Sequence, residues 1–299
     1  NNERKIKIMR LGTSTSLFAR RRDGSRVSYE ERLKLCREAG FSVVELDFSG
    51  ADALTGEGWE AEVSRIGETL AALGLEASQA RAPYNDFLFT AGHLPSEEEK
   101  AELEKSLLHT AEACAKLGVK ELVLRPLNDS VNTEYDAEVI AHTNRDFYLP
   151  FAEKAAAGGT GVVFENMYEL DMALWRRTFG TSVDDLFMLS GLFGGIDAGV
   201  CWDFGHAHQM FSDEVAALKR VGSLIRATCV YDASNVRVSH LIPFIGSIKW
   251  EKLVPALRET GYRGDFVLGA EAFMNDMPDA LRKDAAKIAY DFGAYCMGL

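Results

Sequence analysis

Acidic side chains stand at the ends of short apolar runs in this 299-residue chain. Glu165 ends the run Gly-Val-Val-Phe-Glu, Asp203 ends Gly-Val-Cys-Trp-Asp, and Glu271 follows Phe-Val-Leu-Gly-Ala. An acid at the end of a buried strand is costly to leave unpaired, so several that converge need a shared partner. A divalent cation is the simplest such partner, because the carboxylates neutralise its charge and it relieves their mutual repulsion. The alternative is that each acid pairs with an arginine or lysine at an ordinary barrel rim.

The chain alternates between strand-like and helix-like segments eight times. Apolar runs predict strands over 6–11, 42–48, 77–84, 121–127, 161–166, 196–203, 225–232 and 266–272. Helical periodicity predicts helices over 29–39, 59–73, 96–117, 135–157, 182–189, 213–221, 250–260 and 278–296. Ser96 with Glu99 three residues later forms a capping box, a helix-start signal. Eight strand–helix units over residues 1–299 predict a single (β/α)8 TIM barrel.

In such a barrel the working residues lie at the C-terminal ends of the strands. We therefore expect the polar groups at these ends to share one rim. Besides the three acids above, they are Glu45, Asp47, Arg81, Arg125, His206 and Asp232.

Composition and missing motifs exclude several other functions. The net charge of −12 argues against a nucleic-acid partner. No apolar run is long enough to span a membrane. Five scattered cysteines and the absence of a signal-like start favour the cytoplasm. Nucleotide-binding glycine loops and the GxSxG turn of serine hydrolases are also absent from the sequence.

Five segments, in the right order, resemble the xylose isomerase-like barrel superfamily, and more narrowly its sugar phosphate isomerase/epimerase branch. They are 82–86 (Ala-Pro-Tyr-Asn-Asp), 165–167 (Glu-Asn-Met), 203–208 (Asp-Phe-Gly-His-Ala-His), 240–250 (His-Leu-Ile-Pro-Phe-Ile-Gly-Ser-Ile-Lys-Trp) and 261–274, which runs from Gly-Tyr-Arg-Gly to Glu-Ala-Phe-Met. The resemblance covers nearly the whole chain.

The resemblance implies one divalent metal (Mn, Co, Zn or Mg), held by Glu, Asp, His and Glu after strands five to eight. Glu165, Asp203 and Glu271 match three of these positions, and Cys229 stands where the fourth ligand, a histidine, is expected. A thiolate ligand would shift the metal preference toward softer ions. The alternative is that Cys229 is a small packed strand residue.

Two arginines replace histidines that are usual in the family. Arg81 and Arg125 occupy these positions on the third and fourth strands, and arginine does not ligate metals. A second or third metal is therefore not expected, which argues against the multi-zinc endonuclease branch. Arg81 and Arg125 could grip a phosphate or carboxylate of a substrate. They could instead neutralise Glu165 and Glu271 in place of a metal.

We predict a metal-dependent isomerase or epimerase acting on a small polyhydroxylated carbonyl compound, such as a ketose or keto-cyclitol. Glu165 and Glu271 would transfer protons through an enediolate that the metal stabilises. His206 would position a substrate hydroxyl, and His240 would line the pocket. A lyase or dehydratase using the same enediolate is a near relative. The alternative from a different class is a metal-free barrel that binds a ligand or another subunit. Homo-oligomer formation is left open.

Overall fold

The eight predicted strands close into a barrel. A computed structural model describes residues 9–84, 96–128, 135–169, 177–234 and 237–299. Parallel strands pair in the order β10-β1-β2-β3-β4-β5-β6-β7. Backbone hydrogen bonds from Val230 N to Val267 O (2.8 Å) and from Gly269 N to Val230 O (2.9 Å) join the end of β7 to β10 and so close the barrel. The barrel strands are β1 (Leu11–Ser14), β2 (Val43–Asp47), β3 (Glu76–Arg81), β4 (Glu121–Leu124), β5 (Gly161–Glu165), β6 (Ala198–Asp203), β7 (Ile225–Cys229) and β10 (Phe266–Leu268).

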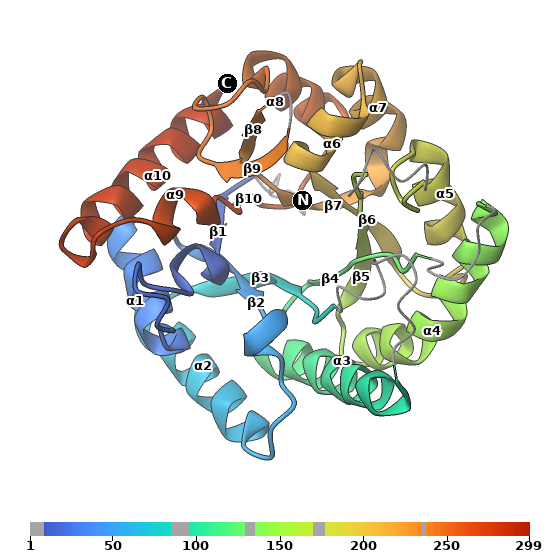
Figure 1. The fold of residues 1–299 in the computed structure, drawn as a ribbon, viewed down its shortest axis with the longest axis horizontal. Coiled ribbons are helices and arrows are strands. Elements are labelled where there is room, and N and C mark those ends of the chain that lie inside the picture. The colour runs from blue at the N-terminus through green and yellow to red at the C-terminus, as the bar shows by residue number, and fades with distance from the viewer. Residues whose placement is uncertain (1–8, 85–95, 129–134, 170–176, 235–236) are drawn as a thin grey trace, which may run out of the picture.

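Helices surround the strands in an outer ring (Figure 1). The ring consists of α1 (Tyr29–Ala39), α2 (Trp59–Leu73), α3 (Glu97–Leu117), α4 (Ala137–Ala157), α5 (Val183–Gly191), α7 (Glu214–Val221), α8 (Trp250–Glu259) and α10 (Arg282–Gly298). The (β/α)8 barrel expected from the sequence is therefore confirmed. Within the described residues, no helix is both long and apolar enough to cross a bilayer.

The sequence explains where these elements begin and end. The capping box predicted at the start of α3 is present, with Ser96 and Glu99 each bonded to the other's backbone N–H. Gly40 and Gly74 end α1 and α2 in the left-handed conformation that glycine adopts without strain. Val162, Val163 and Phe164 of β5 are fully buried, as expected for a strand covered on both faces.

The start of the barrel differs from the prediction. The expected strand 6–11 lies partly outside the described residues, and the observed β1 begins only at Leu11. Leu11 pairs with Phe266, and Gly12 pairs with Val43. A Cβ on Gly12 would lie 3.2 Å from the carbonyl oxygen of Val43. The apolar pattern missed β1 because close packing here selects a short Leu-Gly-Thr-Ser strand over an apolar one.

Short elements follow the strands at the C-terminal rim. Helix α6 (Phe204–Met210) starts directly after β6, because Asp203 accepts a bond from His206 N (2.8 Å) and so caps the helix. A hairpin of β8 (Asp232–Ser234) and β9 (Arg237–Leu241) follows β7, and α9 (Glu271–Asn275) follows β10. Single 3-10 turns are η1 (Thr15–Phe18), η2 (Gly50–Asp52), η4 (Gly222–Leu224) and η5 (Asp279–Leu281). The predicted strand 266–272 is therefore too long, since Glu271 begins a helix.

Asp232 holds the hairpin and its following loop against the barrel. Its buried carboxylate accepts hydrogen bonds from the backbone N–H groups of Ala233 (2.9 Å), Phe244 (2.8 Å) and Ile248 (3.1 Å). It also accepts one from the indole Nε1 of Trp250 (2.9 Å). With four donors already bound, this strand-end acid serves as a structural anchor for residues 232–250.

We expect Asp232→Ala to lower the free energy of unfolding by about 3 kcal/mol or more, because a buried donor left without an acceptor costs about 1–3 kcal/mol. Urea denaturation measures this change. Asp276→Ala, an exposed aspartate at the end of α9, is the control and should change stability by less than about 0.5 kcal/mol. Equal stability of the two variants would contradict the anchoring role.

Candidate functional site

A cavity of about 330 Å³ opens at the C-terminal ends of the strands. This is the end at which TIM barrels carry their sites. Its volume is at the lower end of the range for small-molecule pockets, about 300–1,000 Å³. The lining residues are Ser16, Asp47, Ser49, Arg81, Tyr84, Arg125, Glu165, Asp203, Cys229, His240, Glu271, Ala272 and Asn275.

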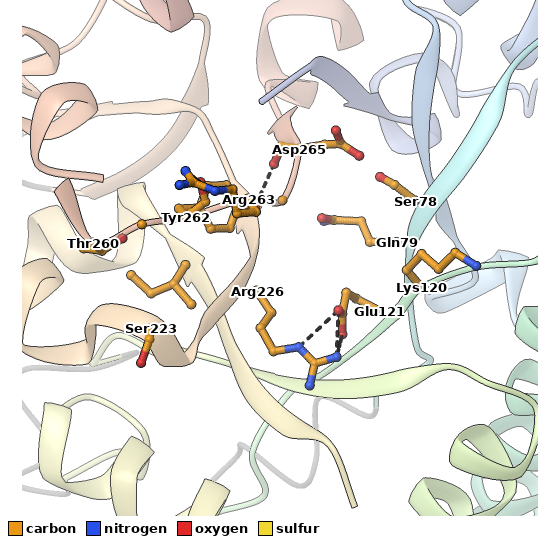
Figure 2. Close-up of a pocket in the computed structure, with 13 residues that line it drawn as sticks. Ser78, Gln79, Lys120, Glu121, Ser223, Arg226, Thr260, Tyr262, Arg263 and Asp265 are labelled. Atoms are coloured by element: carbon orange, nitrogen blue, oxygen red, sulfur yellow. Dashed lines mark hydrogen bonds and ion pairs between the residues drawn. The ribbon is translucent and has the colours of Figure 1, made fainter. Parts of the chain in front are cut away.

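A larger cavity, of about 460 Å³, lies at the opposite end of the barrel (Figure 2). Two of its charged side chains pair with each other: Arg226 binds both oxygens of Glu121 at 2.7 Å. The hydroxyl of Tyr262 donates to the backbone of Asp265 at 2.8 Å, and the Asp265 side chain pairs with Arg10 outside the lining. Size alone favours this cavity, but TIM barrels carry their sites at the C-terminal ends of the strands. We therefore place the candidate site at the C-terminal cavity.

Glu165 lies at the centre of the C-terminal site. It is the last residue of β5 and is completely buried. Arg81 Nη1, from the end of β3, donates to its Oε1 at 2.6 Å. Arg125 Nε, from the residue after β4, donates to its Oε2 at 2.8 Å. Each carboxylate oxygen of Glu165 therefore has its own guanidinium.

The electrostatics of Glu165 follow from these contacts. Burial opposes its charge, but the two guanidinium groups outweigh burial and hold the pKa of Glu165 well below its usual range. Arg81 also lies 3.6 Å from Glu45, which is buried beside it. Burial raises the pKa of Glu45, although Arg81 acts against this shift. Glu165 thus stays ionised at every physiological pH and fixes the two arginines.

Asp203 and His206 form a second part of the site. Asn166 donates from Nδ2 to the carbonyl oxygen of Asp203 (3.0 Å) and accepts from its N–H (2.6 Å). Nδ1 of His206 lies 2.7 Å from the carbonyl oxygen of Asn166, so Nδ1 carries the hydrogen. Burial lowers the pKa of His206, although Asp203 acts in the opposite direction. The imidazole is therefore neutral, with Nε2 as an acceptor.

Glu271 and His240 form a third part. Nδ1 of His240 lies 2.8 Å from Oε2 of Glu271 and 2.9 Å from the carbonyl oxygen of Gly269. Ser16, at the rim after β1, donates to Oε1 of Glu271. Burial opposes the charge on the histidine, but Glu271 outweighs it and raises the pKa of His240 to about 9. The pKa of Glu271 is lowered in turn, since His240 and Ser16 overcome its burial.

The backbone of His240 is strained. Its φ of 43° lies in the left-handed region, which residues other than glycine seldom adopt. Its ring stacks on Tyr231 with the centroids 3.9 Å apart, which fixes the orientation of the imidazole. Strain of this kind gathers at functional sites. It is consistent with a functional role for His240 in this cavity.

The structure brings together most of the residues predicted for the site. Arg81, Arg125, Glu165, Asp203, Cys229, His240 and Glu271 all line the C-terminal cavity. His206 is buried and is not among the lining residues, although one of its ring nitrogens lies within 4.8 Å of carboxylate oxygens of Glu165 and Asp203. Residues 85–86, quoted for the third-strand resemblance, lie outside the described residues. Ser16 and Tyr84 were not predicted as site residues; the signal available was polar residues just after the first and third strands.

We tested whether a divalent metal fits these residues. Glu165, Asp203 and His206 each place one donor atom within 4.8 Å of the others, the one such grouping found among the described residues. Both oxygens of Glu165, however, are already bound to guanidinium groups. A divalent ion about 4 Å from one guanidinium would be repelled by about 8 kcal/mol at an effective dielectric constant of about 20.

The two other expected ligands offer little compensation. Burial raises the pKa of the Cys229 thiol well above its usual range, so a metal that bound it would have to displace its proton at a cost. Glu271 is engaged by His240 and Ser16. The donor set present therefore does not fit a resident metal ion.

Comparison with known proteins agrees with the fold. The family model described as xylose isomerase-like TIM barrel matches residues 33–291. The chain belongs to this family. An uncharacterized protein of Sinorhizobium fredii, y4fM, is 34% identical over 65 residues, which is 22% of this chain and 21% of that protein.

Several solved structures have a similar fold. A D-tagatose 3-epimerase-like protein superposes with a TM-score of 0.72 at 16% identity, over 96% of this chain and 98% of its own. D-psicose 3-epimerase from Clostridium cellulolyticum H10, solved with D-tagatose, gives 0.72 at 13% identity, over 97% and 99%. The 3-keto-D-glucoside 4-epimerase YcjR of E. coli gives 0.70 at 18% identity, over 95% and 99%. At these identities the likeness shows a shared fold.

We expect Glu165→Gln to lower the free energy of unfolding by about 3–5 kcal/mol, because it leaves two guanidinium groups buried without their counter-charge. Chemical denaturation measures the effect. Glu271→Gln is the matched control and should cost less, since the side chain of Glu271 is 27% exposed whereas that of Glu165 is fully buried. If Glu165→Gln were no less stable than Glu271→Gln, the assigned role of the arginines would be wrong.

We also expect His240 to stay protonated through neutral pH and to titrate near pH 9. Its pKa in the unfolded chain is about 6.5. The stabilisation from its pairing with Glu271 should therefore be complete below pH 6.5 and disappear as the pH rises through 9. Imidazole NMR signals recorded against pH, assigned with His240→Gln, measure this. In Glu271→Gln the titration should move to lower pH; an unchanged titration would refute the pairing.

Proposed function

We propose that the protein is an isomerase or epimerase of a small polyhydroxylated carbonyl compound. The observation that carries this proposal is the pairing of Glu271 with His240 at the wall of the C-terminal cavity, where a carboxylate and an imidazolium lie 2.8 Å apart. One group can accept a proton and the other can stabilise an oxyanion. The structural neighbours described above are sugar epimerases or resemble one, which supports the same class of substrate.

The chemistry begins with removal of a proton from carbon next to a carbonyl group. We assign Glu271 as the base, because it is ionised and lines the cavity, its side chain is 27% exposed, and its partners are a serine and an imidazole rather than two guanidinium groups. His240 uses Nδ1 toward Glu271 and Gly269, and its Nε2 has no acceptor among the described residues. Protonated at neutral pH, it can donate from Nε2 to the substrate oxygen as charge develops there.

Glu165 takes a different role in this proposal from the one the sequence suggested. With both oxygens bound to arginines it is a poor proton acceptor, so we assign it to positioning Arg81 and Arg125. A single base can move a proton between adjacent carbons of an enediol, which is aldose–ketose isomerisation. Epimerisation needs a second proton donor on the other face. Isomerisation is therefore the favoured form of the reaction.

The same contacts bear on the metal-dependent mechanism expected from the sequence. Because the donor set does not fit a metal ion, we assign no step to one. Within the described residues, Glu165, Asp203 and His206 offer the best partial ligand set.

A second candidate function is a metal-free barrel that binds a ligand without turning it over. The closed ion pairs of Glu165 favour this alternative, because a carboxylate locked between two arginines is suited to holding a fixed structure. The two functions differ in whether bound sugar exchanges a carbon-bound proton with solvent.

We expect the protein to incorporate deuterium from D₂O into at least one member of a panel of ketoses, aldoses and keto-cyclitols, at the carbon next to the carbonyl. Glu271→Gln should slow the exchange by about 10²–10⁴-fold, the usual contribution of a general base. NMR measures both exchange and product. Glu251→Gln, an exposed glutamate on α8, is the control and should retain the wild-type rate.

Binding of a sugar with no exchange would overturn the enzyme proposal in favour of the second candidate. Exchange that is equally fast in Glu271→Gln would show that another group is the base.

A further inference from the structure

The two arginines at Glu165 are fixed differently. Arg81 is buried and lies between two acids, with Nη1 2.6 Å from Glu165 and Nε 3.6 Å from Glu45. Arg125 is bonded to Glu165 through Nε alone, and its side chain is 20% exposed at the cavity wall. Its guanidinium lies over the ring of Tyr84, 4.0 Å from the centroid. Arg125 is therefore held in place while its terminal nitrogens stay clear of the ion pair.

The free edge of Arg125 has a defined chemistry. Nη1 and Nη2 have no acceptor within the described part of the chain, although they carry a permanent positive charge beside a cavity. A guanidinium edge presents parallel N–H donors that match two oxygens of a carboxylate or phosphate. Stacking on Tyr84 orients this edge before any ligand arrives, which lowers the entropy lost on binding.

The charges around Arg125 also favour an anionic ligand. Glu165 carries one negative charge and contacts two permanent positive charges. The cluster of Arg81, Glu165 and Arg125 has a net charge of +1, as would a divalent metal bound to one carboxylate, although Asp47, Asp203 and Glu271 also line the cavity. The positive charge is local to the Nη edge of Arg125, and an anion bound at that edge needs no metal ion.

We propose that the guanidinium groups of Arg81 and Arg125 neutralise Glu165 in place of a metal ion. The free edge of Arg125 then binds a carboxylate or phosphate group of the substrate. This inference rests on the proposed function for the polyhydroxylated part of the ligand, and it deepens that function by naming an anionic sugar as the substrate class. Arg125 is a specificity-determining residue in this arrangement, and Glu165 positions it.

The test has a metal arm and an anion arm. In the metal arm, protein dialysed against EDTA is titrated calorimetrically with Mn, Co, Zn and Mg, and its metal content is measured by elemental mass spectrometry. We expect no stoichiometric metal and no saturable binding. A retained or rebound equivalent of any of these metals would overturn the replacement of the metal by arginines.

In the anion arm, calorimetry compares D-glucuronate, inorganic phosphate and neutral D-fructose. At least one anion should bind about tenfold or more tightly than D-fructose, since a charge-assisted pair contributes about that factor. Preference for D-glucuronate identifies a carboxylate site, and preference for phosphate identifies a phosphate site. Equal binding of all three compounds would overturn the proposal.

Variants assign the effect to Arg125. Arg125→Gln should weaken the preferred anion about tenfold or more and leave D-fructose unchanged. Arg125→Lys keeps the charge but lacks the paired edge; it should fold and lose part of the affinity, which covers the case in which Arg125→Gln is unstable. Arg263→Gln, an exposed arginine at the opposite end of the barrel, is the control and should bind as wild type does. Undiminished anion binding in both Arg125 variants would overturn the assignment.

The outcomes separate this inference from the proposed function. Tight anion binding without any proton exchange would overturn the isomerase and leave the anion site in place. Proton exchange that needs an added metal would overturn the arginine replacement and leave the isomerase in place.

Discussion

A fully buried carboxylate needs a counter-charge, and at the centre of this barrel Glu165 has two. Their salt bridges join the ends of three consecutive strands, β3, β4 and β5, across the inside of the barrel. Removing the acid would leave two guanidinium groups without their counter-charge, and removing Arg81 would leave Glu165 and Glu45 without the guanidinium that lies between them. The shape of the rim on this side therefore depends on the three side chains staying together.

On the other side of the cavity the arrangement is looser and more exposed. Glu271 starts a short helix, and its partner His240 comes from a hairpin that Asp232 holds against the barrel. In the proposed function, the buried side around Glu165 binds and orients the ligand. The more exposed side carries His240, whose protonation changes at mildly alkaline pH. This division is the basis for assigning proton transfer to Glu271 and His240, and anion recognition to Arg125.

Much of this could be predicted from the sequence, because a barrel imposes a simple rule. Eight apolar runs separated by helices place their C-terminal residues at one rim, so Asp47, Arg81, Arg125, Glu165 and Asp203 were predicted to meet and do so. Cys229 was predicted only from the family resemblance, and it also lines the cavity. The partner of each of these side chains was harder to predict. Whether Glu165 faces a metal or an arginine depends on side-chain distances across three strands, and both alternatives were compatible with the spacing.

The elements that were missed have local causes. The hairpin β8–β9 depends on the buried contacts of Asp232 with residues up to 18 positions away, which no periodic pattern records. Helix α6 begins directly after a strand, because Asp203 serves as its cap while also lining the cavity. The cytoplasmic location and homo-oligomer formation remain predictions.

The salt bridges at Glu165 also limit which substitutions this barrel can accept during evolution. A neutral histidine at position 81 would remove the guanidinium that lies between Glu165 and Glu45 before any metal could stabilise the two acids. Selection would therefore favour changes at this rim that arrive together. Among relatives, the residue types at positions 81 and 125 should accordingly vary together, while a glutamate at position 165 suits either arrangement.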